Sequence, residues 1–205
     1  MYACSLGTHN MRSANRIPET VRFFTQCLRE AGYYCTNRSK EDYNTIKPDG
    51  VWDESSREAT WKKRAPGQPF FSVVNLTVSH ESSLHTIEPT IHDPAQAKLP
   101  PYHPDVPEIR RDRAQYYDKV TEMDRQAGEV LAELEQDGLA GDTIVFYYSD
   151  HGGVLTRSKR FLYDSGTHVP LIIRFPEKHS RLAPGSPGTK TDRLVSFVDF
   201  APTVL

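Results

Sequence analysis

Asp150 and His151 come one residue, Ser149, after an apolar run at residues 144–148 and are followed by Gly152 and Gly153. The apolar run predicts a buried strand that ends at a loop. In parallel α/β sheets, ligands bind beyond the carboxyl ends of the strands, so this loop is a favoured place for chemistry. A carboxylate and a neutral imidazole can hold a divalent cation together. In an isolated pair of this kind, Asp150 more often caps the next turn and His151 is only a loop residue.

The residues that follow strengthen the chemical interpretation. A basic loop contains Lys159 four residues before Tyr163, and a second apolar run begins at Val169 and ends at Phe175. This order resembles the sulfatase family of the alkaline phosphatase superfamily. In that family a strand ending in Ser-Asp-His/Asn-Gly precedes a lysine loop, a Tyr-Glu-Gly-Gly turn and a strand that begins Val-Pro. Residues 164–166, Asp-Ser-Gly, depart mildly from the family turn. The resemblance covers nearly the whole chain and is densest after Tyr116.

The resemblance implies roles for five residues. Lys40 and Lys159 would bind the sulfate group, and His80 would protonate the leaving group or hold a sulfate oxygen. An imidazole suits that work because its ordinary pKa of about 6.5 allows either protonation state near neutrality. Asp150 and His151 would be metal ligands, with calcium expected and magnesium or manganese as alternatives. Without the resemblance, Lys40 would be a solvated loop lysine and His80 a structural histidine.

One residue near Lys40 departs from the family pattern. The family loop carries Lys-x-His, whereas this chain has Asp42 in the place of the histidine. A hydrogen-bond donor is thereby replaced by an acceptor, so the hydrogen bonds expected around the nucleophile do not carry over.

The family nucleophile is a formylglycine made from the cysteine of a Cys-x-Pro-x-Arg motif. That motif and the Asp-Asp pair that supplies further metal ligands do not occur in these 205 residues. Cys4 does not replace the nucleophile, because Ser5-Leu6-Gly7 follows it and the proline and arginine are missing. We therefore expect residues 1–205 to be one partial sulfatase domain, which lacks its nucleophile segment and its C-terminal subdomain and is inactive alone.

The expected activity of the whole protein is metal-dependent hydrolysis of sulfate monoesters. The expected substrate is a small-molecule or carbohydrate sulfate ester, and export to the periplasm or the extracellular space is expected from the family. Two alternatives remain at the level of sequence: a phosphonate monoester or phosphodiester hydrolase of the same superfamily, and an inactive remnant.

Composition and patterning predict an incomplete α/β sandwich of the alkaline phosphatase type, with helices flanking a central, mostly parallel sheet. Charges nearly cancel at a net −2, so no nucleic-acid partner is expected, and no apolar run is long enough for a transmembrane segment. The three cysteines have neither disulfide nor metal spacing. A loop at about residues 81–108 is expected to wall the pocket. Helices are expected at 18–32, at 109–138 and from Val198. Strands are expected at 33–36, at 69–79 ending at His80, at 144–148 and at 169–175.

Overall fold

The computed structural model describes residues 3–205. The chain divides into two compact units, which are described separately. The first runs to Asn75 and includes Lys190–Leu205, and the second is Leu76–Thr189.

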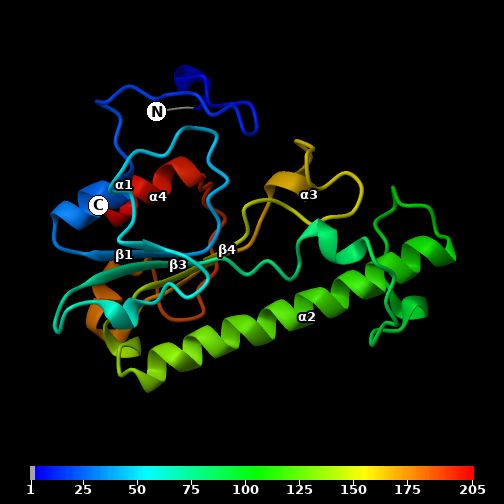
Figure 1. Ribbon diagram of the computed structural model, residues 1–205. Coiled ribbons are helices and arrows are strands. Elements are labelled where there is room, and N and C mark those ends of the chain that lie inside the picture. Colours follow the sequence, from blue (N-terminus) through cyan, green and yellow to red (C-terminus); the bar gives the residue numbers. More distant parts are fainter. Residues whose placement is uncertain (1–2) are drawn as a thin grey trace. The chain divides into compact units, whose positions relative to one another are not determined.

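A parallel sheet forms the centre of the first unit. Its three strands, β1 (Tyr34–Arg38), β2 (Glu54–Ser55) and β3 (Phe70–Val74), lie in the order β2-β1-β3, and both pairings are parallel. Figure 1 shows β1 and β3 running side by side. The expected α/β class with a parallel sheet is confirmed.

The middle strand β1 is buried although it carries polar residues. Cys35, Thr36 and Asn37 each have at most 1% of their surface exposed. The Thr36 hydroxyl donates to Ser72 Oγ at 2.9 Å, and the Asn37 amide accepts from the Asn75 amide at 2.9 Å. These bonds between side chains satisfy the buried polar groups and tie β1 to β3 and the residue after it.

Helix α1 (Phe24–Glu30) begins later than the sequence predicted. Pro18 does not open it: the Pro18 carbonyl accepts from Val21 N–H at 2.8 Å in a turn, and the backbone is still extended at Phe23. The predicted end is confirmed, because Gly32 has a φ of 92°, a left-handed conformation that favours glycine.

The strand predicted to run to His80 is shorter, and this prediction was wrong. β3 ends at Val74, whose partner Arg38 is the last residue of β1. Asn75 still donates its N–H to the Arg38 carbonyl at 2.9 Å, but no further partner strand is present beyond that point in the described chain. His80 instead precedes a 3₁₀ turn at Glu81–Leu84.

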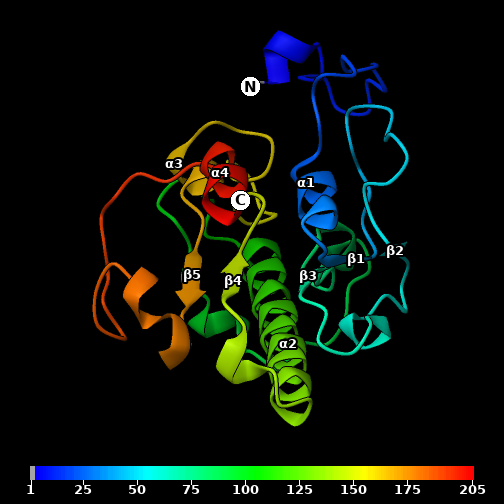
Figure 2. The ribbon, with the colours of Figure 1, turned by 90° about the vertical axis from the view of Figure 1, so that its left-hand side faces the viewer.

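In the second unit, helix α2 (Pro107–Gln136) runs beside the antiparallel pair β4 (Val145–Tyr148) and β5 (Leu171–Arg174), as Figure 2 shows. The helix is 30 residues long and ends before Gly138, which has a φ of 70°. The predicted helix is therefore confirmed, with its start two residues earlier. Leu134 is buried on this helix, whereas Leu131 is 41% exposed.

The long loop before α2 is held down by two helix side chains. Gln115, which is 2% exposed, donates to the carbonyls of Ser83 and Thr86 at 3.1 and 2.8 Å. Asp118 accepts from the backbone N–H groups of Ile91 and His92 at 2.9 and 3.0 Å. The loop is therefore an ordered layer on α2.

Short elements complete the chain. Helix α3 (Asp164–Thr167) follows the lysine loop, and helix α4 (Phe200–Val204) continues a 3₁₀ turn at Phe197–Asp199, one residue before the predicted start. The other 3₁₀ turns are Ala3–Leu6, Trp61–Lys63, Pro94–Gln96, Ala140–Asp142 and Glu177–Leu182. Across residues 3–205, no helix is both long and apolar enough to cross a bilayer.

Candidate active site

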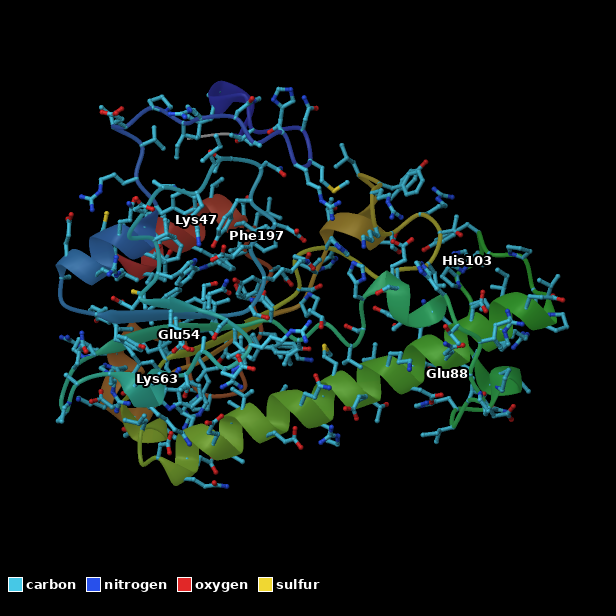
Figure 3. The ribbon with its side chains drawn as sticks, viewed as in Figure 1. Lys47, Glu54, Lys63, Glu88, His103 and Phe197 are labelled. Atoms are coloured by element: carbon cyan, nitrogen blue, oxygen red, sulfur yellow. The ribbon has the colours of Figure 1, made fainter. Side chains whose placement is uncertain are left out.

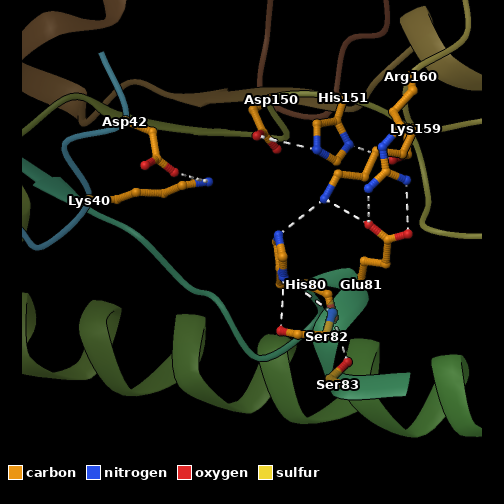
Figure 4. Close-up of polar contacts among 11 residues, drawn as sticks. Lys40, Asp42, His80, Glu81, Ser82, Ser83, Asp150, His151, Lys159 and Arg160 are labelled. Atoms are coloured by element: carbon orange, nitrogen blue, oxygen red, sulfur yellow. Dashed lines mark hydrogen bonds and ion pairs between the residues drawn. The ribbon is translucent and has the colours of Figure 1, made fainter. Parts of the chain in front are cut away.

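The second unit brings together two of the predicted catalytic residues. Lys159 Nζ lies 3.0 Å from His80 Nε2, although the two residues are 79 positions apart in the chain (Figure 4). The Lys159 side chain is only 16% exposed, whereas His80 is exposed at the start of its turn. The ammonium is therefore largely buried and donates to the imidazole.

Ser82 contacts Nδ1 of the His80 ring through both its hydroxyl and its backbone N–H. An ammonium can only donate, so a neutral His80 must accept at Nε2 and carry its proton on Nδ1. That proton then reaches Ser82 Oγ, 3.0 Å away. In the other tautomer, Nδ1 accepts from Ser82 N–H at 3.2 Å and the proton is on Nε2. Ser82 can therefore support either tautomer.

Glu81 joins the two basic side chains of the lysine loop. Its carboxylate accepts two hydrogen bonds from Arg160, at 2.9 and 2.7 Å, and its Oε2 lies 3.3 Å from Lys159 Nζ. The hydrogen bonds from Arg160, and then those from Lys159, lower the pKa of Glu81 to about 2. Glu81 is therefore an anion at any working pH.

Two glycines allow the Asp-His loop and the lysine loop to meet backbone to backbone. Gly152 N–H donates to the Gly166 carbonyl at 2.9 Å, and Lys159 N–H donates to the Gly153 carbonyl at 2.9 Å. A Cβ on Gly152 would lie 1.8 Å from the Ser165 carbonyl oxygen, so only glycine fits there. The two loops form one rigid platform.

The side chains of Asp150 and His151, the predicted metal ligands, lie next to each other in the loop after β4. His151 Nδ1 lies 2.8 Å from the Gly152 carbonyl, which can only accept, so Nδ1 carries the proton and the Nε2 lone pair is left for a metal. That Nε2 lies 3.5 Å from Asp150 Oδ2, a separation that two ligands of one cation can share. The Asp150 side chain is 67% exposed and His151 is 33% exposed. The pair fits a divalent cation.

The pair does not form a complete metal shell. Within residues 3–205, no group of three or more His, Cys, Asp or Glu side chains is placed to hold a metal ion. Calcium takes 6–8 oxygen ligands, so carboxylates outside this group would have to supply the rest.

Lys40 lies in the first unit, in the segment that follows β1. Its Nζ is 3.8 Å from Asp42 Oδ2, and the two side chains are 39% and 60% exposed. Asn37 holds this segment by donating to the Lys40 carbonyl at 3.0 Å. Asp42 thus pairs with Lys40, and the role of Lys40 in sulfate binding stays a prediction.

Arg157 connects the lysine loop to the long loop before α2. Its guanidinium lies 4.7 Å from the Tyr102 ring centre and 4.2 Å from that of Tyr163. Nearby, His103 Nε2 lies 3.0 Å from the Thr156 carbonyl oxygen, and its buried Nδ1 has no hydrogen-bond partner among the described residues. The long loop therefore packs against the lysine loop, and its role as a pocket wall stays a prediction.

The sequence alone did not identify Glu81 and Ser82 as candidate functional residues. Their position beside His80 was the only available signal, and a residue next to a candidate acid is more often a loop residue. Arg160 and His168 stood near Lys159 in the sequence. Arg160 pairs with Glu81, whereas His168 lies 3.6 Å from the exposed Asp164.

The α/β fold, with a parallel sheet in the first unit, is the class of fold expected from the sequence. The Sulfatase family matches residues 1–205, and this chain belongs to that family. It is 38% identical to the ulvan-active sulfatase of Formosa agariphila, covering all of this chain and 42% of that protein. It is 27% identical to arylsulfatase K of Xenopus laevis, over 97% of this chain and 43% of that protein. Human N-sulphoglucosamine sulphohydrolase is 35% identical over 57% of this chain and 22% of that protein. The chain thus spans about two fifths of the length of the first two relatives.

Proposed function

We propose that the protein containing this chain hydrolyses sulfate monoesters, with Lys159 and His80 at the ester. The main support for this proposal is the 3.0 Å contact between Lys159 Nζ and His80 Nε2. This contact brings together two residues from loops that are far apart in the chain. A carbohydrate sulfate is the proposed substrate class, because the relative named as ulvan-active sulfatase matches the whole chain.

The roles follow from the chemistry of the residues. As the S–O bond breaks, negative charge grows on the leaving oxygen, and the sulfate oxygens stay anionic. Lys159 donates to a sulfate oxygen, which stabilises that charge in a partly buried position. Once Lys159 turns to the sulfate, His80 carries its proton on Nε2 and gives it to the leaving oxygen. Lys40 is proposed from the family pattern as a further sulfate-binding ammonium.

Asp150 and His151 are the proposed ligands of a calcium ion, with magnesium or manganese as alternatives. Such an ion supplies positive charge beside the sulfate group. Asp150 contributes an anionic oxygen, and His151 contributes a nitrogen oriented by its bond to the Gly152 carbonyl. The nucleophile, a formylglycine by family resemblance, belongs to sequence beyond these 205 residues.

The test compares esters in the full-length protein that carries this chain. 4-Nitrophenyl sulfate should be turned over faster than 4-nitrophenyl phosphate or a phenylphosphonate ester. Lys159→Ala should lower kcat/KM for the sulfate about 100-fold, the size of losing a principal charge-stabilising donor. Lys178→Ala is the matched control, because Lys178 is also ion-paired, with Asp142 at 2.5 Å. Faster turnover of the phosphorus esters, or equal effects of the two variants, would refute the proposal.

A further inference from the structure

We propose that Glu81 is a positioning residue for Lys159, which holds the ammonium at His80 through a link to Arg160. This inference rests on the proposed function of Lys159. Glu81 adjoins His80 in the chain, so one short segment supplies both the imidazole and the anchor for the ammonium.

The geometry of the link is that of an anchor. Arg160 grips both carboxylate oxygens of Glu81, and paired hydrogen bonds of this kind fix orientation as well as distance. Lys159 Nζ shares Oε2 with Arg160 and also reaches His80 Nε2. The contact with Glu81 uses only one of the three N–H donors of the ammonium, so the donor that reaches His80 can turn to a sulfate oxygen while Glu81 holds the side chain. A lysine side chain without such partners would sample many rotamers.

The backbone of the lysine loop supports the same interpretation. Arg157 and Arg160, on either side of Lys159, have φ values of 69° and 72°, in the left-handed region that disfavours residues other than glycine. Such strain persists where surrounding contacts impose it, and it concentrates at functional sites. Here the contacts are the two tyrosine rings around Arg157 and the Glu81 carboxylate on Arg160.

Glu81 carries a negative charge and therefore cannot attract an anionic substrate. Because its pKa lies at about 2, Glu81 is ionised and repels an anionic ester. Lys159 and Arg160 together carry a charge of +2, and Glu81 reduces the net charge of the three side chains to +1. A carboxylate that weakens binding of the anion must contribute something else, and the contacts show that this is the orientation of Lys159.

The orientation role predicts a loss of kcat without an increase in KM. In Glu81→Gln, KM for 4-nitrophenyl sulfate should stay the same or fall, because a repelling charge is lost. The kcat should fall about tenfold or more, since small displacements of a catalytic group cost up to about 100-fold. Glu81→Asp keeps the charge on a shorter side chain, so kcat should fall while KM does not improve.

Glu88→Gln is the matched control, because Glu88 also accepts from a lysine, Lys119, at 2.6 Å. Figure 3 labels Glu88 beside α2. This variant should leave both kinetic constants unchanged. Thermal unfolding of each variant verifies folding, and Glu81→Asp decides the question if Glu81→Gln does not fold.

A readout independent of activity separates this inference from the proposed function. Trace acetylation of the full-length protein, followed by peptide mass spectrometry, reports how strongly each amine is held. Lys159 should react several times faster in Glu81→Gln than in the wild type, and Lys119 should do so only in Glu88→Gln. Unchanged labelling of Lys159, or an increase in KM at constant kcat, would overturn the positioning role. Absence of sulfatase activity in the wild type would overturn the proposed function and leave the labelling result intact.

Discussion

His80 and Lys159 touch through Nε2 and Nζ at 3.0 Å, and this contact makes the protonation of one depend on what the other binds. While Lys159 donates to the imidazole, Nε2 has no proton to give. When a sulfate oxygen accepts the hydrogen bond of the Lys159 ammonium in place of His80, the imidazole can carry its proton on Nε2. Ser82 N–H then donates to Nδ1. Substrate binding would thereby prepare the acid.

His80→Ala should therefore harm poor leaving groups more than good ones. A nitrophenolate needs little protonation, whereas a sugar alkoxide needs a proton, and general acids contribute about 10² to 10⁴-fold. We expect a small loss of kcat with 4-nitrophenyl sulfate and a loss in that range with a sugar sulfate. His92→Ala is the control, because His92 is also exposed and paired, with Asp118 at 2.6 Å. Equal losses on both esters would mean that His80 only holds a sulfate oxygen.

Gly152→Ala should loosen the platform on which the two loops meet. The new Cβ would overlap the Ser165 carbonyl oxygen, and overpacking of this kind costs about 1–3 kcal/mol. Gly128→Ala, in the same unit, meets nothing within 4 Å and lies inside α2, so it should stabilise the helix by about 0.5–1 kcal/mol. Chemical denaturation of the two variants checks the contrast. A Gly152→Ala protein as stable as the wild type would show that the loops are not rigidly joined.

Sequence patterns predicted the regular elements better than the places where they stop. The period of α2 and the stop at Gly138 are local signals, and both were confirmed. The end of β3 is set by its neighbouring strand, because Val74 pairs with the last residue of β1. No residue pattern within residues 69–79 indicates this end. An apolar run predicts a strand but does not show how far a partner accompanies it.

The same division applies to the site. Lys159 and His80 were predicted from motif resemblance, and the structure adds that they meet. The role of Glu81 could not be predicted, because it depends on a contact with Arg160, which is 79 residues away in the chain. A carboxylate becomes an anchor only when the fold brings the guanidinium to it, and a single sequence does not encode that distance in any local pattern.

Cys35 should resist thiol reagents in the folded protein. Its side chain is fully buried in β1, and burial, followed by the nearby charge of Asp53, raises the pKa of the thiol to about 12. At pH 8 only about one such thiol in 10,000 is ionised, and the thiolate is the reactive form. Cys4 is exposed and should react first, with the partly exposed Cys27 more slowly. Maleimide labelling with mass spectrometry checks this order. Labelling of Cys35 at the rate of Cys4 before denaturation would contradict the buried strand.

Asp150 should link calcium to stability. A ligand that binds only the folded state stabilises it by about 2.7 kcal/mol at 100 times its Kd, so calcium should raise the Tm of the full-length protein. Asp150→Ala removes the anionic oxygen 3.5 Å from His151 Nε2 and should abolish most of that increase. Asp142→Ala is the control, since Asp142 is an exposed carboxylate paired with Lys178 and His179. Differential scanning fluorimetry with calcium, magnesium, manganese or EGTA reads out both effects. An equal rise in Tm for the wild type and Asp150→Ala would remove Asp150 from the metal site, and a larger rise with manganese would favour the softer ion expected of an imidazole ligand.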